Sequence, residues 1–446
     1  MHSLTCVYLP VGVPTFHLET AQAQFEASVQ LLGSIDPNII VPGEPLLSIE
    51  AVRAFLEGKQ PDLIIYQNVT FAHAAYATEV MRQTDAPLLL WTLAEPEGDG
   101  GRLKLNSLTG AFSAGHTHKA MRGTPLQYVI GAPDNPTVKT TVSAVVMAAR
   151  VKKSLRSLNL AMIGHTPSGF GFGRALDTEM AHVFGVTLVS IESRELTKIA
   201  RELPEEALKT ATETAHARMV DLTSTPQKNR TDFIRLYEAY RQFVEQHQIG
   251  ALASRCWPDF FTDYGTPVCA VLGMLNENRV AAACEADAWG ALSMVIGERL
   301  SDLPTYLGDP VALNPKDNTI TFWHCGTGPC NLAHPSEGAL TGVHPNRKIG
   351  PTMEFGLRAS ERATLFRIGR LPSGQFRFFI HEGAILDKPK QFCGTSLVFQ
   401  ASTPVEPLIT TLVKDGWEPH FVVIYDHVAE ALTVLAEMLN LEIVRF

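Results

Sequence analysis

Two carboxylates, Glu285 and Asp287, lie two residues apart in the segment VAAACEADAWGALSM, which spans residues 280–294. The apolar run before them predicts a buried strand, and the pattern after them predicts a helix. Side chains two residues apart on a strand point the same way, so both acids are expected to face one site. Ligands of open α/β sheets bind at the carboxyl ends of strands, where this pair is predicted to lie.

The two acids differ in how easily a structural role explains them. Asp287 is well placed to cap the helix that begins at Ala288, by accepting hydrogen bonds from its first free amides. Glu285 has no such role, because an acid after an apolar run is costly to bury unless it is paired, hydrogen-bonded or bound to a metal. Capping and chemistry therefore both stay open for Asp287.

Other candidate residues follow predicted strands. His324 lies in a turn directly after the strand predicted at 319–323, where it is either a structural residue bonded to the backbone or a contact to substrate or metal. Arg255 and Trp257 follow the strand GALAS and could bind and stack on a sugar, or anchor a domain interface. His116 and His118 are expected to be exposed in a helix or loop, and the alternative is that they reach the site of a neighbouring subunit.

Strand-length apolar runs alternate with helical periodicity over the first two thirds of the chain, which is typical of parallel sheets with crossover helices. After about residue 303 the pattern changes to short strands separated by Gly, Pro and Asn, which indicates a mostly antiparallel β domain or barrel. We therefore predict two Rossmann-like α/β domains, at 1–157 and 158–302, and a barrel-like C-terminal domain at 303–446.

Composition excludes several classes of protein. The 446 residues carry a net charge of -9 and no basic run, which argues against nucleic acid as a partner. Neither a secretion signal nor an apolar run of membrane-spanning length is visible, so the expectation is a cytoplasmic protein that does not bind membranes. The seven cysteines include no CxxC pair and are expected to be reduced, with Cys256, Cys269 and Cys284 in the core.

The glycine-rich segment GHTPSGFGFG follows the strand predicted at 160–164 and leads toward a helix predicted near Arg174. It lacks the Gly-x-Gly-x-x-Gly spacing of dinucleotide sites and the Gly-Lys-Ser/Thr of phosphate loops. A tight turn is the main interpretation, and contact with an anion or substrate is the alternative.

Four blocks together resemble the L-fucose isomerase and L-arabinose isomerase superfamily, in the same order along the chain. They are RCWPDF at 255–260, ACEADAWGALSM at 283–294, FWHCG at 322–326 and EPHFVVIYDH at 418–427. The resemblance implies an aldose–ketose isomerase of three domains that uses a divalent metal, usually Mn²⁺. It also implies a homo-oligomer, a trimer or hexamer, in which a neighbouring subunit helps to form the active site.

Carried onto this sequence, the resemblance implies that Glu285, Asp287 and His420 are metal ligands and that Glu285 and Asp287 are catalytic. Arg255, Trp257 and His324 are the candidate substrate-binding residues. One glutamate ligand of the superfamily falls on Cys269, so this chain belongs to a divergent branch. One imidazole with carboxylate oxygens suits manganese and leaves positions open for two sugar oxygens.

Three functions remain open at this point. The first is a metal-dependent isomerase that moves a proton between C1 and C2 of a free sugar through a cis-enediol. The second is a diverged relative that binds a sugar, or an isomerase specialised for an anionic sugar such as sulfoquinovose. The third, a periplasmic-type binding protein, is disfavoured by the missing signal peptide and the added β domain.

Overall fold

The computed structural model describes residues 4–446, which fold as two compact units. The first unit comprises Met1–Ser154, apart from the three residues not described, together with Glu430–Asn440. The second comprises Leu155–Ala429 and Leu441–Phe446. The predicted boundaries at 157 and 302 do not follow from this division and stay a prediction.

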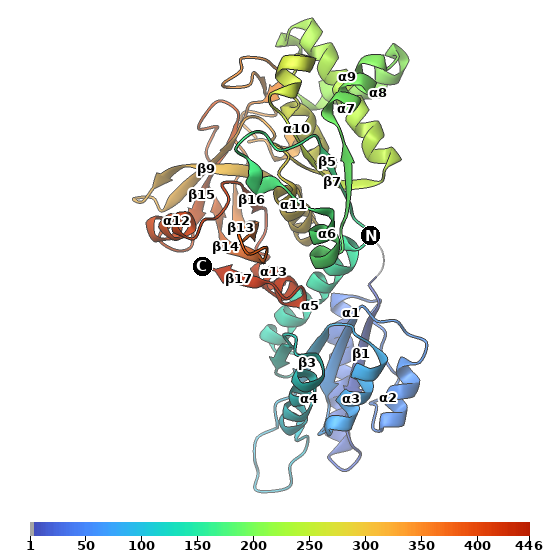
Figure 1. The fold of residues 1–446 in the computed structure, drawn as a ribbon. Coiled ribbons are helices and arrows are strands. Elements are labelled where there is room, and N and C mark those ends of the chain that lie inside the picture. Colours follow the sequence, from blue (N-terminus) through green and yellow to red (C-terminus); the bar gives the residue numbers. More distant parts are fainter. Residues whose placement is uncertain (1–3) are drawn as a thin grey trace. The chain divides into compact units, whose positions relative to one another are not determined.

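The first unit is built on a parallel sheet of four strands in the order β1-β2-β3-β4. Its first three strands are buried throughout, as expected for a parallel sheet covered on both faces. The elements are β1 (Cys6–Val11), α1 (Leu18–Ile35), α2 (Ile49–Leu56), β2 (Leu63–Asn68), α3 (Ala74–Gln83), β3 (Leu88–Thr92), α4 (Ser107–Arg122), β4 (Gln127–Ile130) and α5 (Pro136–Leu155), with α13 (Ala429–Met438) later in the chain (Figure 1).

The second unit opens with another parallel sheet of four strands, in the order β6-β5-β7-β8. Its strands are β5 (Asn159–Ile163), β6 (Thr187–Ile191), β7 (Ile249–Ser254) and β8 (Ala281–Ala283). Its helices are α6 (Asp177–Glu179), α7 (Ser193–Glu202), α8 (Lys209–Arg218), α9 (Gln227–Gln246), α10 (Cys269–Glu277) and α11 (Ala288–Ser301).

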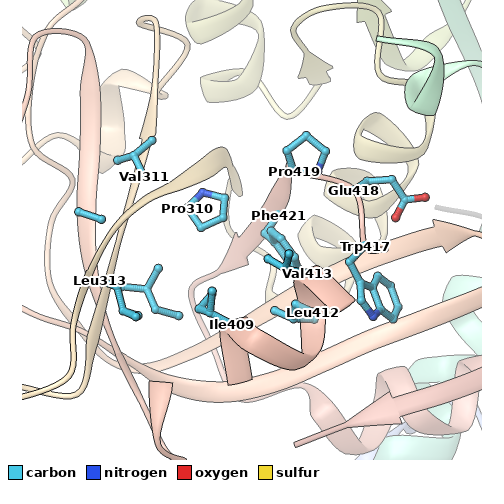
Figure 2. A pocket seen from close by; sticks show the side chains of 12 residues that line it. Pro310, Val311, Leu313, Ile409, Leu412, Val413, Trp417, Glu418, Pro419 and Phe421 are labelled. Carbon is cyan, nitrogen blue, oxygen red and sulfur yellow. The ribbon is translucent and has the colours of Figure 1, made fainter. Parts of the chain in front are cut away.

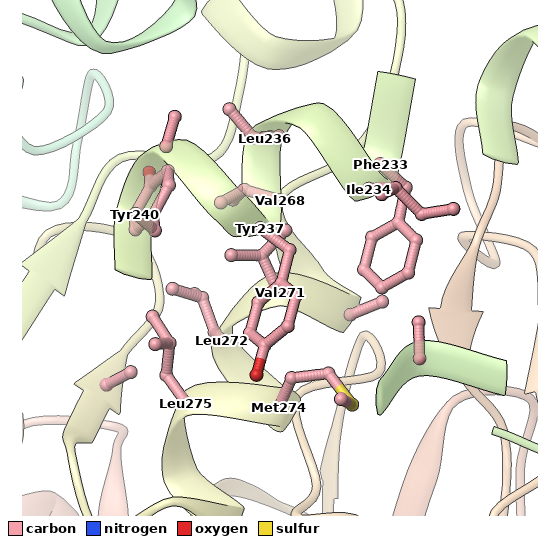
Figure 3. Packing of buried hydrophobic residues seen from close by; sticks show 14 of the residues in the cluster. Phe233, Ile234, Leu236, Tyr237, Tyr240, Val268, Val271, Leu272, Met274 and Leu275 are labelled. Atoms are coloured by element: carbon pink, nitrogen blue, oxygen red, sulfur yellow. The ribbon is translucent and has the colours of Figure 1, made fainter. Parts of the chain in front are cut away.

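Helix α9 shows why these segments fold as they do. Its apolar residues recur every three or four positions, so one face is continuous and buried. Figure 3 shows Tyr237 of this face pointing toward α10, which carries Val271 and Leu275, and all three belong to one buried cluster. This core fixes α10, which leads into β8 and so into the segment that carries the paired acids.

The rest of the second unit is a closed barrel of six antiparallel strands. Strand β13 pairs with β16 at one end of the order and with β14 at the other, which closes the sheet on itself. The strands are β9 (Tyr306–Asn314), β10 (Thr319–His324), β13 (Ser360–Arg370), β14 (Phe376–Ile385), β15 (Thr395–Ala401) and β16 (Phe421–Ile424). Two short strands, β11 (Thr341–Gly342) and β12 (Thr352–Met353), pair outside it.

Strand β14 is long enough to pair with two different strands along the same edge. Residues 383–385 pair with β15, while residues 377–380 pair in parallel with β17 (Glu442–Arg445). Helix α12 (Val405–Lys414) contributes to the barrel core through Leu408 and Leu412. The predicted fold class, two parallel-sheet α/β regions followed by an antiparallel barrel, is confirmed.

Helix α11 joins the second sheet to the barrel. It contacts β7 and β8 on one side and β13 and β16 on the other. Of its fourteen residues only Arg299 and Ser301 are not buried. The N-terminus of α11 therefore lies where the carboxyl end of β8 meets the barrel, and the candidate site is built there.

Candidate active site

The paired acids follow β8 in a left-handed turn rather than lying on the strand. β8 ends at Ala283, and Glu285 and Ala286 both have positive φ angles, 60° and 53°. Such backbone is unfavourable for residues with a Cβ and tends to occur at functional sites. The N–H of Ala286 donates to the carbonyl of Ser254 in β7 at 2.9 Å, which holds the turn. The expectation that both acids face one way along a strand was therefore wrong in its geometry.

Both carboxylates nevertheless meet the same imidazole, that of His420. Its Nε2 atom lies 3.1 Å from Oε2 of Glu285, and its Nδ1 atom lies 2.9 Å from Oδ2 of Asp287. His420 directly precedes β16 and is buried. The left-handed turn thus places the two acids on opposite edges of one ring.

Asp287 is fully buried and has no free oxygen. It accepts the N–H of Gly290 at 2.9 Å, so the capping role predicted from the sequence is confirmed. Arg367 of β13, also fully buried, donates to both of its oxygens, at 2.5 and 3.1 Å. Burial alone would raise the pKa of Asp287, but Arg367 and His420 hold it far below its usual range.

Glu285, by contrast, keeps some exposure, with 11% of its side chain accessible. Burial alone would raise its pKa, but His420, His324 and a hydrogen bond with the Trp257 side chain lower it below the usual range. Glu285 is therefore an anion at neutral pH, and it lies between the solvent and the two buried histidines, His324 and His420.

His324 completes a cluster with Glu285 and His420, whose ligand atoms all lie within 4.8 Å of one another. The Nε2 atom of His324 is buried without a hydrogen-bond partner among the described residues. Its Nδ1 atom accepts the N–H of Cys325 at 3.0 Å. Burial lowers the pKa of His324, so its ring is neutral at physiological pH.

The pKa of His420 shifts the other way. Burial alone would lower it, but the hydrogen bonds with Asp287 and Glu285 raise it to about 10. One buried imidazole is thus charged and its neighbour neutral, with ring centroids 5.6 Å apart.

Asp309 is a further acid at this site, and sequence reasoning missed it. Its Oδ1 atom lies 3.5 Å from Nε2 of His420, and 30% of its side chain is accessible. Burial is the largest influence on Asp309 and raises its pKa. It lies in β9, and the pairings of β9 with β10 and β16 bring it beside His324 and His420.

The glycine-rich loop also reaches the site. Phe172 packs edge-on against His420 at 5.3 Å, and Phe170 packs edge-on against Trp257 at 5.8 Å. A Cβ on Gly173 would lie 2.8 Å from the Cα of Asp287, so only glycine allows this approach. The helix predicted near Arg174 is instead a 3₁₀ turn at Gly171–Gly173 followed by α6.

Several predicted residues lie beside the cluster rather than in it. Trp257 is half-buried and bonded to Glu285, whereas Arg255 lies 3.3 Å from Asp259 and is paired with it. Cys269 is fully buried against the thiol of Cys284 and is not among the three clustered ligand atoms.

The two histidines of α4 belong to the first unit. His116 is exposed as expected, but His118 is 3% exposed, so its predicted exposure was wrong. The cause is helical geometry: two positions along a helix turn a side chain to a different face.

A separate groove lies elsewhere on the second unit. Apolar residues of β9 and α12 line a groove of about 320 Å³, shown in Figure 2, in which Glu418 is the only charged residue among those that line it. This groove has no group suited to acid–base catalysis at its centre. The cluster of Glu285, His324 and His420 does have such groups. No helix within residues 4–446 has the length and apolar character needed to cross a membrane.

No model of a known protein family matches the sequence. Full-length relatives are nevertheless clear. The chain is 55% identical over 442 residues to a sulfoquinovose isomerase of Clostridium sp. (strain MSTE9), with 99% of both chains covered. It is 35% identical over 446 residues to a sulfoquinovose isomerase of Priestia megaterium, and 36% identical over 449 residues to one of Alkalicoccus urumqiensis, again with 99% of both chains covered.

Proposed function

Because this chain belongs to the sulfoquinovose isomerase family and is an aldose–ketose isomerase, we propose that its substrate is sulfoquinovose and that it needs a divalent cation. The observation that carries the proposal is the convergence of Glu285, His324 and His420 at one point. The wider kinship with L-fucose and L-arabinose isomerases is part of the same proposal.

The donor set fits a divalent cation such as Mn²⁺. Two imidazole nitrogens and one carboxylate oxygen suit first-row divalent metals, and three protein ligands leave positions for substrate oxygens. His420, which is charged without the cation, would release its Nε2 proton when the cation binds. The buried Nε2 atom of His324 has no other partner among the described residues, which a ligand role would explain. Its hydrogen bond from Cys325 favours a proton on Nε2 when no cation is bound, so binding would move that proton to Nδ1 and break the bond from Cys325.

Asp287 is better suited to position His420 than to bind the cation itself. Its contact with Nδ1 keeps a proton on that atom and directs Nε2 toward Glu285. A carboxylate behind a ligating histidine fixes its tautomer and orientation. We therefore assign Asp287 a positioning role, in place of the ligand and base roles expected from the resemblance.

The reaction moves one proton between two neighbouring carbons. When bound, the cation would polarise the carbonyl and the adjacent hydroxyl of the open-chain sugar and so acidify the C2 proton. We propose that Asp309 takes that proton, leaving a cis-enediolate with its negative charge on O1, and then returns the proton to C1 as the hydroxyl proton moves from O2 to O1. Asp309 is the more exposed of the two acids near His420 Nε2, so it is the one a substrate can approach.

Three further properties stay predictions: the trimer or hexamer with a shared active site, the cytoplasmic location, and the identity of the metal as manganese. Cluster residues Glu285, His324 and His420 all come from one unit of one chain. The described residues thus account for the three proposed ligands without a neighbouring subunit.

The test is proton exchange at C2 in heavy water, followed by proton NMR with purified protein, Mn²⁺ and sulfoquinovose. We expect loss of the C2 signal and appearance of the ketose, both abolished by a chelator. Glu285→Gln and His324→Gln should lower Mn²⁺ affinity and turnover together by roughly 10- to 100-fold or more. Glu361→Gln removes an exposed acid of β13 and is the matched control.

Three outcomes would contradict the proposal. Wild-type protein that exchanges C2 of neutral aldoses but not of sulfoquinovose would exclude the substrate. Full turnover by metal-free protein would exclude the role of the cation. Tight Mn²⁺ binding without exchange of any sugar would favour the diverged sugar-binding relative.

A further inference from the structure

The loop between β11 and β12 presents an arginine, Arg347, on an internally bonded turn. The Nδ1 atom of His344 accepts the backbone N–H groups of Asn346 and Arg347, at 3.3 and 3.2 Å. The backbone N–H of His344 donates to Ile349, and that of Lys348 donates to His344, both at 2.9 Å. This turn is therefore ordered by its own hydrogen bonds.

The same turn is attached to the protein through His344. Its ring is buried and packs edge-on against Phe261, with ring centroids 4.8 Å apart. Burial, His324 and Arg347 together lower the pKa of His344 to about 4, so this anchor is neutral at physiological pH. Arg347 is therefore held in place by an uncharged residue.

The guanidinium of Arg347 lies over the aromatic residues beside the cluster. Its central carbon is 5.6 Å from the ring centroid of Trp257 and 6.0 Å from that of Phe261. Trp257 in turn is hydrogen-bonded to Glu285. One indole ring thus separates the positive charge of Arg347 from the acid that we propose as a metal ligand.

Arg347 has no acidic partner among residues 4–446, and its side chain is exposed. Arg255, the nearby arginine predicted from the sequence to bind substrate, is different. Its Nε atom lies 3.3 Å from Asp259 and donates to the carbonyl of Trp257 at 3.4 Å. Of these two arginines, only Arg347 has no carboxylate paired with it among the described residues.

We propose that Arg347 recognises the sulfonate of the substrate, an inference that rests on the proposed function. Sulfoquinovose carries its sulfonate on C6, at the opposite end of the carbon chain from the C1 and C2 atoms that react. With C1 and C2 at the cluster, the carbon chain lies along Trp257 and the sulfonate meets the guanidinium. The planar fork of arginine matches an oxyanion, and the aromatic rings beneath it hold its orientation.

The test compares sulfoquinovose with 6-deoxyglucose, a neutral sugar that lacks the sulfonate, in wild-type protein and in Arg347→Gln. C2 exchange in heavy water measures both sugars even where turnover is slow. We expect kcat/KM for sulfoquinovose to fall roughly 10- to 100-fold, mostly through KM, because a charged hydrogen bond is lost. The value for 6-deoxyglucose should change less than about threefold, and Arg347→Lys should recover part of the loss.

Arg201→Gln is the matched control. Arg201 is also exposed and also lies over an aromatic ring, Tyr264 at 5.2 Å, but in α7. Arg201→Gln should leave kcat/KM unchanged for both sugars. Circular dichroism and Mn²⁺ titration confirm that each variant is folded and binds metal.

The possible outcomes distinguish the role of Arg347 from the proposed substrate on which it rests. An unchanged value for sulfoquinovose in Arg347→Gln would overturn the role of Arg347 while the proposed substrate stands. An equal loss for both sugars would also overturn it, because Arg347 would then support the site in general. Wild-type protein inactive on sulfoquinovose would remove the proposed substrate itself.

Discussion

At the scale of single residues, the site depends on a buried chain of charges from Arg367 through Asp287 to His420. Asp287→Asn would remove the carboxylate that is hydrogen-bonded to the fully buried guanidinium of Arg367. Breaking such a pair costs about 3–5 kcal/mol, because the remaining charge stays desolvated. We expect this loss in urea unfolding, together with a large fall in kcat as His420 loses its orientation.

Adding Arg367→Met to Asp287→Asn should recover much of the stability but none of the activity, because the unpaired charge is gone while His420 stays unsupported. Asp426→Asn is the control, since its pair with Arg362 is exposed and worth under about 1 kcal/mol. If Asp287→Asn alone were as stable as wild type, Asp287 would not be needed to balance the charge of Arg367.

The sequence predicted some of these residues and not others. Glu285 stood out because an acid after an apolar run needs a partner, and His420 came from the resemblance. Arg367 and Asp309 were missed, although each interrupts an apolar strand, in TLFRIG and YLGDPV, where a charge implies a buried partner. Their partners are distant in sequence and meet them only once the barrel has closed, so no local pattern names them.

At the scale of elements, the N-terminus of α11 must approach the site closely. A Cβ on Gly290 would lie 2.6 Å from Oδ2 of Asp287 and 3.1 Å from Nη1 of Arg367. Gly290→Ala should therefore displace the carboxylate from both partners, lower stability by about 1–3 kcal/mol and reduce kcat. Thermal unfolding and C2 exchange measure the two effects.

Gly33→Ala, in α1, provides the opposite case. No atom lies within 4 Å of the place that the added methyl group would occupy, so the change should be neutral or stabilise the helix by up to about 1 kcal/mol. If both variants gained stability alike, the close approach at Gly290 would not constrain the site.

Element order was predicted well because period-two and period-3.6 patterns are local. The expectation for the acids failed because a pattern of residue types does not report a positive φ angle at Glu285 and Ala286, neither of which is glycine. The glycine-rich loop was taken mainly as a turn, yet Phe172 in it packs on His420. That role depends on the barrel, which supplies His420 from about 250 residues further along the chain.

At the scale of the whole molecule, alternation of strands and helices followed by short strands was enough to predict the fold class. Closure of the barrel by β13 and β14, and the sharing of β14 between β15 and β17, were not predictable in the same way. Both depend on pairings between strands whose register is set by the packed core rather than by their own residues.

Global stability should depend on pH through Glu298 of α11. This side chain is 2% exposed, and its Oε1 atom has no hydrogen-bond partner among the described residues. Burial raises its pKa from 4.5 to about 8, despite the opposing charges of Arg279 and Arg299. Between these two values the unfolded chain has released the proton and the folded chain has kept it.

The unfolded state therefore binds fewer protons in that window, so the contribution of Glu298 to stability is greatest below pH 4.5 and falls until pH 8. Glu298→Gln removes this dependence. Relative to wild type, the free energy of unfolding of the variant should be higher by on the order of 4 kcal/mol at pH 9 and little changed at pH 5. Urea unfolding at both pH values measures this difference. Glu361→Gln, at an exposed position, should show the same small difference at both pH values. A gain from Glu298→Gln that is equal at pH 5 and pH 9 would mean that the buried carboxyl is not protonated in the folded protein, and that α11 accommodates its charge.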